Sequence, residues 1–543
     1  MPVRLRPRVQ LSGQLKKAML PRVIQPPRHT LPPPGSPPPD YASWTKDQLI
    51  ERLRKLDGRR HPSPPPSRAP PKTFDFSKAP RRKIALKFCY VGSEYGGLVF
   101  QDADTALPTV EETLYNALAK TRLIDGGAGP KACEWERCGR TDRGVSSAGQ
   151  VVSLYVRSAL GSPPNLAPET DTEARTDAGG AIDAPADVPQ EEEEEEEGAF
   201  GGLEGFESLD LEPESGPSAS TCTAPPSKEL RYVATLNRVL PPSLRVLAWS
   251  PVSPDFSARY SCRARHYKYF FHPHALDIEA MRRGAARVVG AHDFRNLSKL
   301  DPGKQLTNYT RAIARAEINP VEGTAMYVLD LVGNAFLYHQ VRHIMGVLFL
   351  VGAGLEAPSI ITDLTNADPS APIRAYAPAD PAPAVVTCKP VYEMADALPL
   401  VLWDCKYAEG DVRWQADGAP SDRATEQEDR WSSLYEQMQA IHQRAQIHGA
   451  IDKLFLDASA VYHRPSPNPF PLARPLAETP DALAGKGVFS IPTGGGTFRR
   501  TGKYVPVLER KRLEHVDIVN ERWRQNKAGK ADAGRLADDD GDE

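Results

Sequence analysis

The spacing of apolar residues changes several times along this chain, and each change predicts a different element. Apolar residues alternate with others from Lys83 to Tyr90, which predicts a half-buried strand. Val110 to Leu123 instead has helical spacing, and Thr109 with Glu112 supplies the residues of a capping box at its start. A second half-buried strand is predicted from Val151 to Val156.

In the second half of the chain, segments with the alternating spacing of strands are interspersed with segments that have helical spacing. Strands are predicted at Arg245–Ser250, Arg265–Phe271 and Tyr327–Val332. Helices are predicted at Asp277–Val289, Phe336–Leu350 and Thr425–Ala458. Residues 354–390 carry Ala-Pro repeats, which are typical of a loop. Such runs predict an α+β fold in which mainly antiparallel sheets are flanked by helices.

Proline-rich and acidic stretches separate the patterned parts of the chain. Residues 1–80 hold 18 prolines and predict a disordered Pro/Arg-rich arm, with one short amphipathic helix at 44–57. A later segment, 158–227, is too acidic and too poor in apolar residues to form a core, and we interpret it as a disordered insertion. The predicted parts are the arm 1–80, an N-terminal half 81–245 that contains the insertion, a C-terminal half 246–523 and a disordered tail 524–543.

The net charge of −3 conceals two blocks of opposite sign. Between Ser158 and Pro226 there are 18 acidic residues and one basic residue, so 66 basic and 52 acidic residues remain elsewhere, a net charge of +14. A positive sum is expected of a nucleic-acid binder, because neutralisation of phosphates supplies much of the affinity. A solvated lysine-rich surface would give the same sum. We interpret the acidic insertion either as an inert spacer or as a mimic of RNA that weakens nonspecific binding.

Cysteines, apolar runs and the N-terminal charge bear on the cellular setting. The seven cysteines are odd in number and contain no Cys-x-x-Cys pair, which favours a reducing compartment and predicts no metal site. The longest apolar run, Ile344 to Ala353, has about half the length of a membrane span. The first 39 residues carry seven Arg or Lys and no acid, and they fit a basic arm or a nuclear-import patch better than a transit peptide.

The most informative motif runs from Cys138 to Gln150. In it Asp142 stands between Arg140 and Arg143 and is flanked by glycines. Nearby guanidinium groups favour the ionised form of a carboxyl group, which is the form that a nucleophile or general base needs. The alternative is a turn aspartate that caps its own backbone, a frequent use of Asp beside Gly. The residues of the motif alone leave both interpretations open.

Six blocks of sequence resemble the TruA family of tRNA pseudouridine synthases, and they follow one another in the order found in that family. The blocks are Tyr90–Gln101, Gly139–Gln150, Leu236–Pro241, Phe256–Arg259, Arg265–Tyr269 and Gly333–Arg342. Details at His292–Asn296 and Pro399–Trp403 are most similar to the eukaryotic branch. Within that branch the likeness is greatest to enzymes that modify positions 38 and 39 of the tRNA anticodon stem-loop.

The resemblance implies a fold and a set of catalytic roles. It implies two related α/β halves whose sheets form a central basic RNA-binding cleft. Asp142 would be the nucleophile that isomerises uridine, by attack on the base, by attack on the sugar or through a glycal route. Tyr267 would stack on the flipped uracil, Arg342 would pair with the aspartate, and Arg140 would help to displace the target base. The alternatives are an ordinary buried aromatic residue and solvated surface arginines.

The resemblance implies no cofactor and no metal, and its implied partner is tRNA, bound through the anticodon stem-loop and away from membranes. A homodimer is left open. The expected location is nucleus and cytoplasm, with a mitochondrial pool as an option.

Three histidines, His292, His339 and His343, are interpreted as core residues or tRNA contacts. Alternative functions are the same chemistry at other tRNA positions, or a catalytically silent protein that binds or folds tRNA; the intact catalytic blocks argue against the silent protein.

Overall fold

The structure is a computed structural model that describes residues 44–60, 74–101, 106–160, 229–274, 276–417, 433–463, 489–501 and 503–539. The chain divides into two units, the first ending at Thr73 and the second beginning at Phe74. In the first unit the described residues form one helix, α1 (Lys46–Arg60), where the sequence predicts a short helix. Residues 1–43 and 61–73 of the predicted arm, most of the acidic insertion and the last four residues lie outside the described residues.

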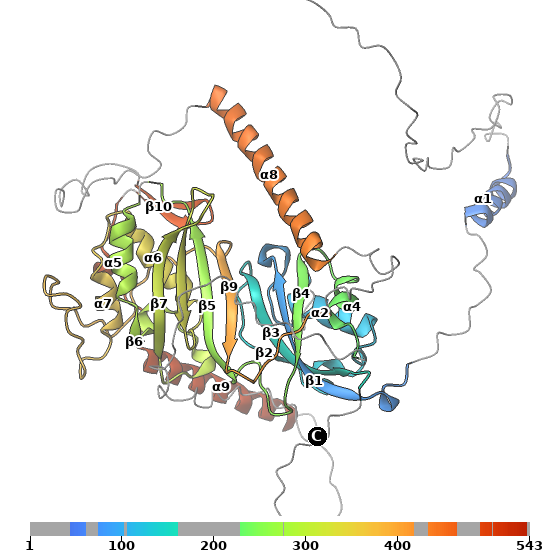
Figure 1. Cartoon of the computed structure of the whole chain (residues 1–543), viewed down its shortest axis with the longest axis horizontal. Coiled ribbons are helices and arrows are strands. Elements are labelled where there is room, and N and C mark those ends of the chain that lie inside the picture. The colour runs from blue at the N-terminus through green and yellow to red at the C-terminus, as the bar shows by residue number, and fades with distance from the viewer. Residues whose placement is uncertain are drawn as a thin grey trace, which may run out of the picture. The chain divides into compact units, whose positions relative to one another are not determined.

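The second unit is built around a large mixed sheet (Figure 1). Within the described residues this sheet has nine strands, eight of them in the order β4-β1-β3-β9-β5-β8-β7-β6, and β2 also pairs with β3. The strands are β1 (Arg81–Tyr90), β2 (Glu136–Arg137), β3 (Ser146–Arg157), β4 (Leu244–Pro251), β5 (Cys262–Phe271), β6 (Gly290–Asp293), β7 (Thr310–Pro320), β8 (Tyr327–Gly333) and β9 (Leu400–Tyr407). Neighbouring strands are antiparallel except for β3 and β9, so the predicted fold class is confirmed.

Helices pack near both ends of this sheet (Figure 1). The helices are α2 (Val110–Lys120) and α4 (Tyr232–Asn237) near β1 and β4, and α5 (Ile278–Ala286), α6 (Gln340–Gly352) and α7 (Ile360–Thr365) near β5 to β8. Two hydrophobic cores result, one that includes Leu86 of β1 and Leu114 of α2, and one that includes Tyr269 of β5 and Phe349 of α6. The predicted capping box is present, because Thr109 and Glu112 exchange side-chain-to-backbone hydrogen bonds of 3.2 and 3.3 Å.

The parallel contact between β3 and β9 joins the two parts of the sheet. It has two register pairs, Ser146 with Val401 and Ser147 with Leu402. The Ser147 hydroxyl donates a 2.8 Å hydrogen bond to the Leu402 carbonyl. At Gly149 a Cβ would lie 2.6 Å from the carbonyl oxygen of Trp403, so the strands meet where glycine allows a close approach. This short junction fixes the start of β3, four residues after Asp142, against the C-terminal part of the sheet.

Some of the described elements differ in their bounds from the predicted ones. Helix α6 begins at Gln340 rather than Phe336, because His339 has a left-handed backbone with φ of 60°, which a right-handed helix cannot contain. The predicted loop 354–390 contains α7. Residues 425–432 of the predicted helix 425–458 lie outside the described residues, and α8 (Leu434–Tyr462) covers the rest. Helix α9 (Val516–Asp539) runs past residue 524, where the sequence predicts the start of a tail. None of the described helices is both long and apolar enough to cross a membrane.

Candidate active site

The turn that carries Asp142 is held from both sides by neighbouring strands. The Asp142 carbonyl accepts a 3.1 Å hydrogen bond from the Val145 amide, which closes the turn. The Tyr90 hydroxyl at the end of β1 lies 2.6 Å from the Thr141 hydroxyl, and the Gln150 side chain of β3 donates to the Gly139 carbonyl at 2.9 Å. The position of Asp142 is therefore set by β1 and β3 rather than by the loop alone.

Gly92 shows how tightly this turn is packed. Its amide donates a 3.0 Å hydrogen bond to the Ser146 hydroxyl. A Cβ at Gly92 would lie 2.1 Å from the Val145 carbonyl oxygen, a distance that no side chain can occupy. The backbone of the segment after β1 thus lies directly against the turn, and only glycine permits this approach.

The Asp142 carboxylate faces two cationic or polar groups from the start of α6. Its Oδ2 accepts a 3.2 Å hydrogen bond from Arg342 Nη1, as the resemblance implies, and lies 3.3 Å from His339 Nε2. Arg342 Nε also donates to the Ala395 carbonyl at 2.8 Å, which fixes the guanidinium plane. Sequence reasoning did not assign His339 to Asp142; its position three residues before Arg342 was the available signal.

Tyr267 lies on β5 with its ring buried, at 9 % exposure. The ring packs edge-on against Phe336, with 5.0 Å between centroids and 80° between planes. Burial raises the pKa of Tyr267 well above its usual value, so the phenol is neutral at physiological pH. The side chain is thus an uncharged aromatic group whose position is fixed by packing.

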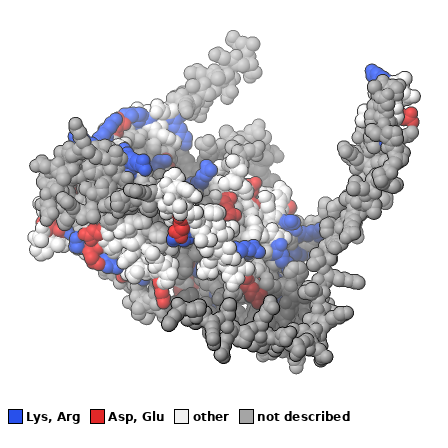
Figure 2. All heavy atoms as spheres, turned by 90° about the horizontal axis from the view of Figure 1, so that it is seen from above, with Lys and Arg blue, Asp and Glu red and all other residues white. Residues whose placement is uncertain are grey.

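All four predicted site residues border one cavity of about 470 Å³, a size typical of small-ligand sites. Asp142, Arg140, Tyr267 and Arg342 come from three segments far apart in the sequence, and Arg140 is exposed. The cavity is strongly basic, because two aspartates and eight basic residues line it. The basic residues are Arg137, Arg140, Arg143, Arg259, Arg265, Lys304, Arg311 and Arg342. Elsewhere, on the face shown in Figure 2, Lys and Arg lie in separate groups rather than in one continuous patch.

The two basic residues that flank Tyr267 on β5 contact the neighbouring strand. His266 Nε2 and Lys268 Nζ lie 2.6 and 3.1 Å from Asp330 Oδ1 of β8. Although burial opposes ionisation, hydrogen bonds from His266 and Lys268 hold the pKa of Asp330 below its usual range. Because side chains alternate along a strand, these residues face away from Tyr267 and support the sheet.

His343, the residue after Arg342 on α6, forms a buried pair of titratable groups with Lys389. Lys389 Nζ is 3.1 Å from His343 Nε2 and donates a hydrogen bond to the Ser298 carbonyl. Burial lowers the pKa of Lys389 to about 7, and burial together with the Lys389 charge lowers that of His343 to about 2. His343 is therefore a neutral core residue, as one of the two sequence interpretations has it.

The sequence of this chain is similar to those of known proteins. Residues 285–408 match a family model described as tRNA pseudouridine synthase. Over 512 residues the chain is 33% identical to the tRNA pseudouridine(38/39) synthase of Saccharomyces cerevisiae, an alignment that covers 90% of this chain and 93% of that relative. It is 35% identical over 387 residues to the human tRNA pseudouridine(38/39) synthase, covering 68% of this chain and 66% of the relative.

A more distant similarity reaches the archaea. The tRNA pseudouridine synthase A of Methanosarcina mazei is 27% identical over 286 residues, or 53% of this chain and 77% of that protein. The segment matched by the family model includes His339 and Arg342, whereas Asp142 and Tyr267 precede it. The geometry of the cavity is thus the evidence that links those two residues to the matched segment.

Proposed function

Because this chain belongs to the tRNA pseudouridine synthase family, we propose that it modifies uridines 38 and 39 in the anticodon stem-loop of tRNA. The enzyme is an isomerase that converts uridine to pseudouridine in tRNA. The choice of positions is supported by the yeast and human relatives, whose names specify positions 38 and 39.

The reaction rearranges one nucleotide without any change in its composition. The bond between uracil N1 and C1′ breaks, the base turns, and a new bond joins C5 to C1′. The proton on C5 is lost and N1 gains one, so no oxidant, reductant or second substrate is consumed. The enzyme must extrude the nucleotide from the RNA, hold the base while it turns and supply a carboxylate. A basic cavity of about 470 Å³ with an aspartate in its wall fits these requirements.

We assign the nucleophile to Asp142. Its contacts with Arg342 and His339 fix the orientation of the carboxylate, and a fixed nucleophile attacks more readily than a mobile one. The single observation that carries the proposal is that this arginine, 200 residues later in the chain, reaches the aspartate within 3.2 Å at the wall of the cavity.

Tyr267 and Arg140 complete the proposed site. Tyr267 offers a neutral ring in the cavity wall, suited to stacking on the extruded uracil. Arg140 is exposed at the same cavity and has the charge and reach to fill the place of the displaced base or to contact a phosphate. The other basic residues of the lining would hold the flanking phosphates, since such contacts position a nucleic acid without reading its sequence.

Asp142→Asn tests the assignment. The amide keeps the shape of the side chain but is not a nucleophile, so we expect pseudouridine formation to be lost and tRNA affinity to change by less than about threefold. Asp301→Asn is the matched control, because Asp301 borders the same cavity and an asparagine can keep its cap on the Gly303 amide. Turnover by the Asp142 variant near the wild-type rate would exclude Asp142 as the nucleophile.

The cellular setting follows as a proposal from the sequence. We propose a nuclear and cytoplasmic enzyme, with the basic arm as the import signal and a mitochondrial pool as the alternative. Imaging of a C-terminally tagged chain with and without residues 1–39 would distinguish these two locations.

A homodimer is the proposed oligomer, and light scattering of the free enzyme would show a mass near twice that of one chain.

A further inference from the structure

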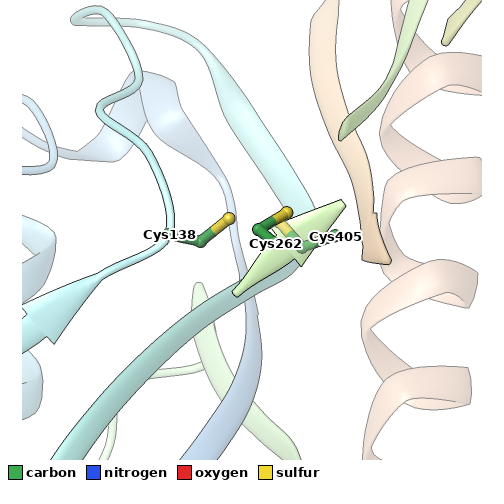
Figure 3. A group of neighbouring side chains, drawn as sticks. All are labelled: Cys138, Cys262 and Cys405. Carbon is green, nitrogen blue, oxygen red and sulfur yellow. The ribbon is translucent and has the colours of Figure 1, made fainter. Parts of the chain in front are cut away.

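Three cysteines from distant parts of the chain meet beside the catalytic turn (Figure 3). Cys138 immediately precedes the Gly139–Asp142 turn, Cys262 begins β5 and Cys405 lies on β9. Their sulfur atoms all lie within 4.8 Å of one another, and the thiols are buried, at 1, 8 and 3 % exposure. Figure 3 shows the Cys138 side chain pointing toward the other two. Among the described residues no other group of His, Cys, Asp or Glu has such spacing.

From this cluster we propose that Cys138, Cys262 and Cys405 bind one thiophilic metal ion, with zinc as the fitting ion. Zinc binds thiolates at about 2.3 Å, and sulfurs at tetrahedral positions around it are about 3.8 Å apart. Shifts of about 1 Å or less in the three side chains would bring the observed spacing to that value. Structural zinc sites with three cysteines are completed by a fourth donor. Tyr407 lies on the same strand as Cys405, and its hydroxyl donates a 2.8 Å hydrogen bond to the Ala258 carbonyl.

The charge beside the cluster suits a divalent ion. Arg265 is buried, and its Nη2 donates to the Cys138 carbonyl at 3.0 Å. This hydrogen bond holds the guanidinium charge beside the cysteine cluster. Three thiolates around a divalent ion carry one net negative charge, which this guanidinium balances without a carboxylate. Three thiolates around a monovalent ion would leave an excess negative charge in a buried site, which is unfavourable.

The place of the cluster in the fold gives the ion a role. Cys138 belongs to the part of the sheet that contains β1 and β3, and the other two cysteines belong to β5 and β9. These parts are joined by the two register pairs between β3 and β9. A bound ion would therefore reinforce a short junction and anchor the residue directly before the catalytic turn. The ion would be structural and would take no part in bond making.

Metal content of the full chain, purified without chelator, tests the proposal. We expect about one zinc per chain in the wild type, at least fivefold less in Cys405→Ser, and a lower Tm for that variant. Cys133→Ser is the matched control, because Cys133 is an equally buried free thiol in the other core and should leave the zinc content unchanged. Asp142→Asn should also retain its zinc, so loss of catalysis and loss of metal can be told apart.

X-ray absorption at the zinc edge of the wild-type protein is a second measurement that needs no variant. A first shell with three sulfurs at about 2.3 Å supports the site even if Cys405→Ser does not fold. A metal-free wild type, a shell of nitrogen and oxygen alone, or unchanged zinc in Cys405→Ser overturns it. A disulfide between two of the three cysteines in the purified enzyme would overturn it as well.

Discussion

At the scale of single residues, the site depends on side chains that sequence separates and folding brings together. Asp142 and Arg342 could be paired from the sequence only because their motifs resemble known ones, since nothing in the local pattern of either residue points to the other. His339 was not assigned to the site, because its contact depends on a left-handed backbone that is unusual for a residue other than glycine. Such local strain is found where the surrounding structure holds a functional group in place.

Arg342→Lys tests whether Arg342 acts by orienting the Asp142 carboxylate or only by its positive charge. Lysine keeps the positive charge but cannot donate to Asp142 and to the Ala395 carbonyl from one planar group. We expect turnover to fall by roughly 10²-fold, because the carboxylate loses its fixed orientation, while tRNA affinity stays within about threefold. Single-turnover rates and filter binding measure the two effects.

The control is Arg522→Lys, in an exposed ion pair with Glu514 that does not border the cavity. It should match the wild type in both measurements. A turnover by Arg342→Lys within twofold of the wild type would mean that charge alone suffices at this position.

Lys389 predicts a pH dependence of stability. Its pKa of about 7 lies below the ordinary value of 10.5, so between these values the unfolded chain binds a proton that the folded chain does not. The free energy of unfolding therefore rises with pH from about 7 to about 10.5, and below pH 7 the cost of the buried charge is present in full. Relative to Lys389→Met, the wild type should gain about 2 kcal/mol between pH 7 and pH 9.

Urea unfolding of both proteins at the two pH values measures this gain. The Met variant also leaves the Ser298 carbonyl without its Lys389 donor, but that loss is the same at both pH values. A difference between the two proteins that does not change with pH would mean that Lys389 titrates normally.

At the scale of elements, the local sequence pattern predicts where strands and helices form, but it does not predict which strands pair with one another in the sheet. The alternation in β1 and the capping box of α2 depend on residues close in sequence, and both are present in the structure. The insertion of β9 between β3 and β5 depends on pairing across about 250 residues, which no local period encodes. The cysteine cluster could not be predicted for the same reason, because its three members are far apart in the sequence and share no local motif.

Two glycines should respond in opposite ways to the same substitution. In Gly92→Ala the new Cβ would meet the Val145 carbonyl at 2.1 Å, so the turn must move, and we expect a loss of at least about 2 kcal/mol. In Gly449→Ala, on α8, nothing lies within 4 Å of the new Cβ, and the helix should gain about 1 kcal/mol. Chemical denaturation measures both, and a neutral Gly92→Ala would show that the turn is more adaptable than its contacts indicate.

At the scale of the whole molecule, opposite charges are divided between segments. The cavity is lined by basic groups, and the acidic insertion, 18 acids to one base, is tethered to the same chain. Deletion of Gly161 to Pro225 should leave turnover within about twofold, because the deleted residues belong to no predicted strand or helix. Affinity for unrelated RNA should rise at low salt, and the gain should fade as salt screens it.

A version with every acid of this segment replaced by its amide separates charge from length and should behave like the deletion. Equal affinity of all three proteins at every salt concentration would identify the insertion as an inert spacer. Titration of labelled RNA at several salt concentrations decides between these outcomes.

The short contact between β3 and β9 also has a consequence for biosynthesis. Ser147 leaves the ribosome about 250 residues before Leu402, its partner across the junction. At roughly 5–20 residues per second that interval lasts on the order of 10–50 s. Throughout it, the start of β3 has an open edge of the kind that invites pairing with other chains. Protection of the nascent chain by chaperones should therefore matter most before β9 emerges, and slower elongation there should reduce the yield of native enzyme.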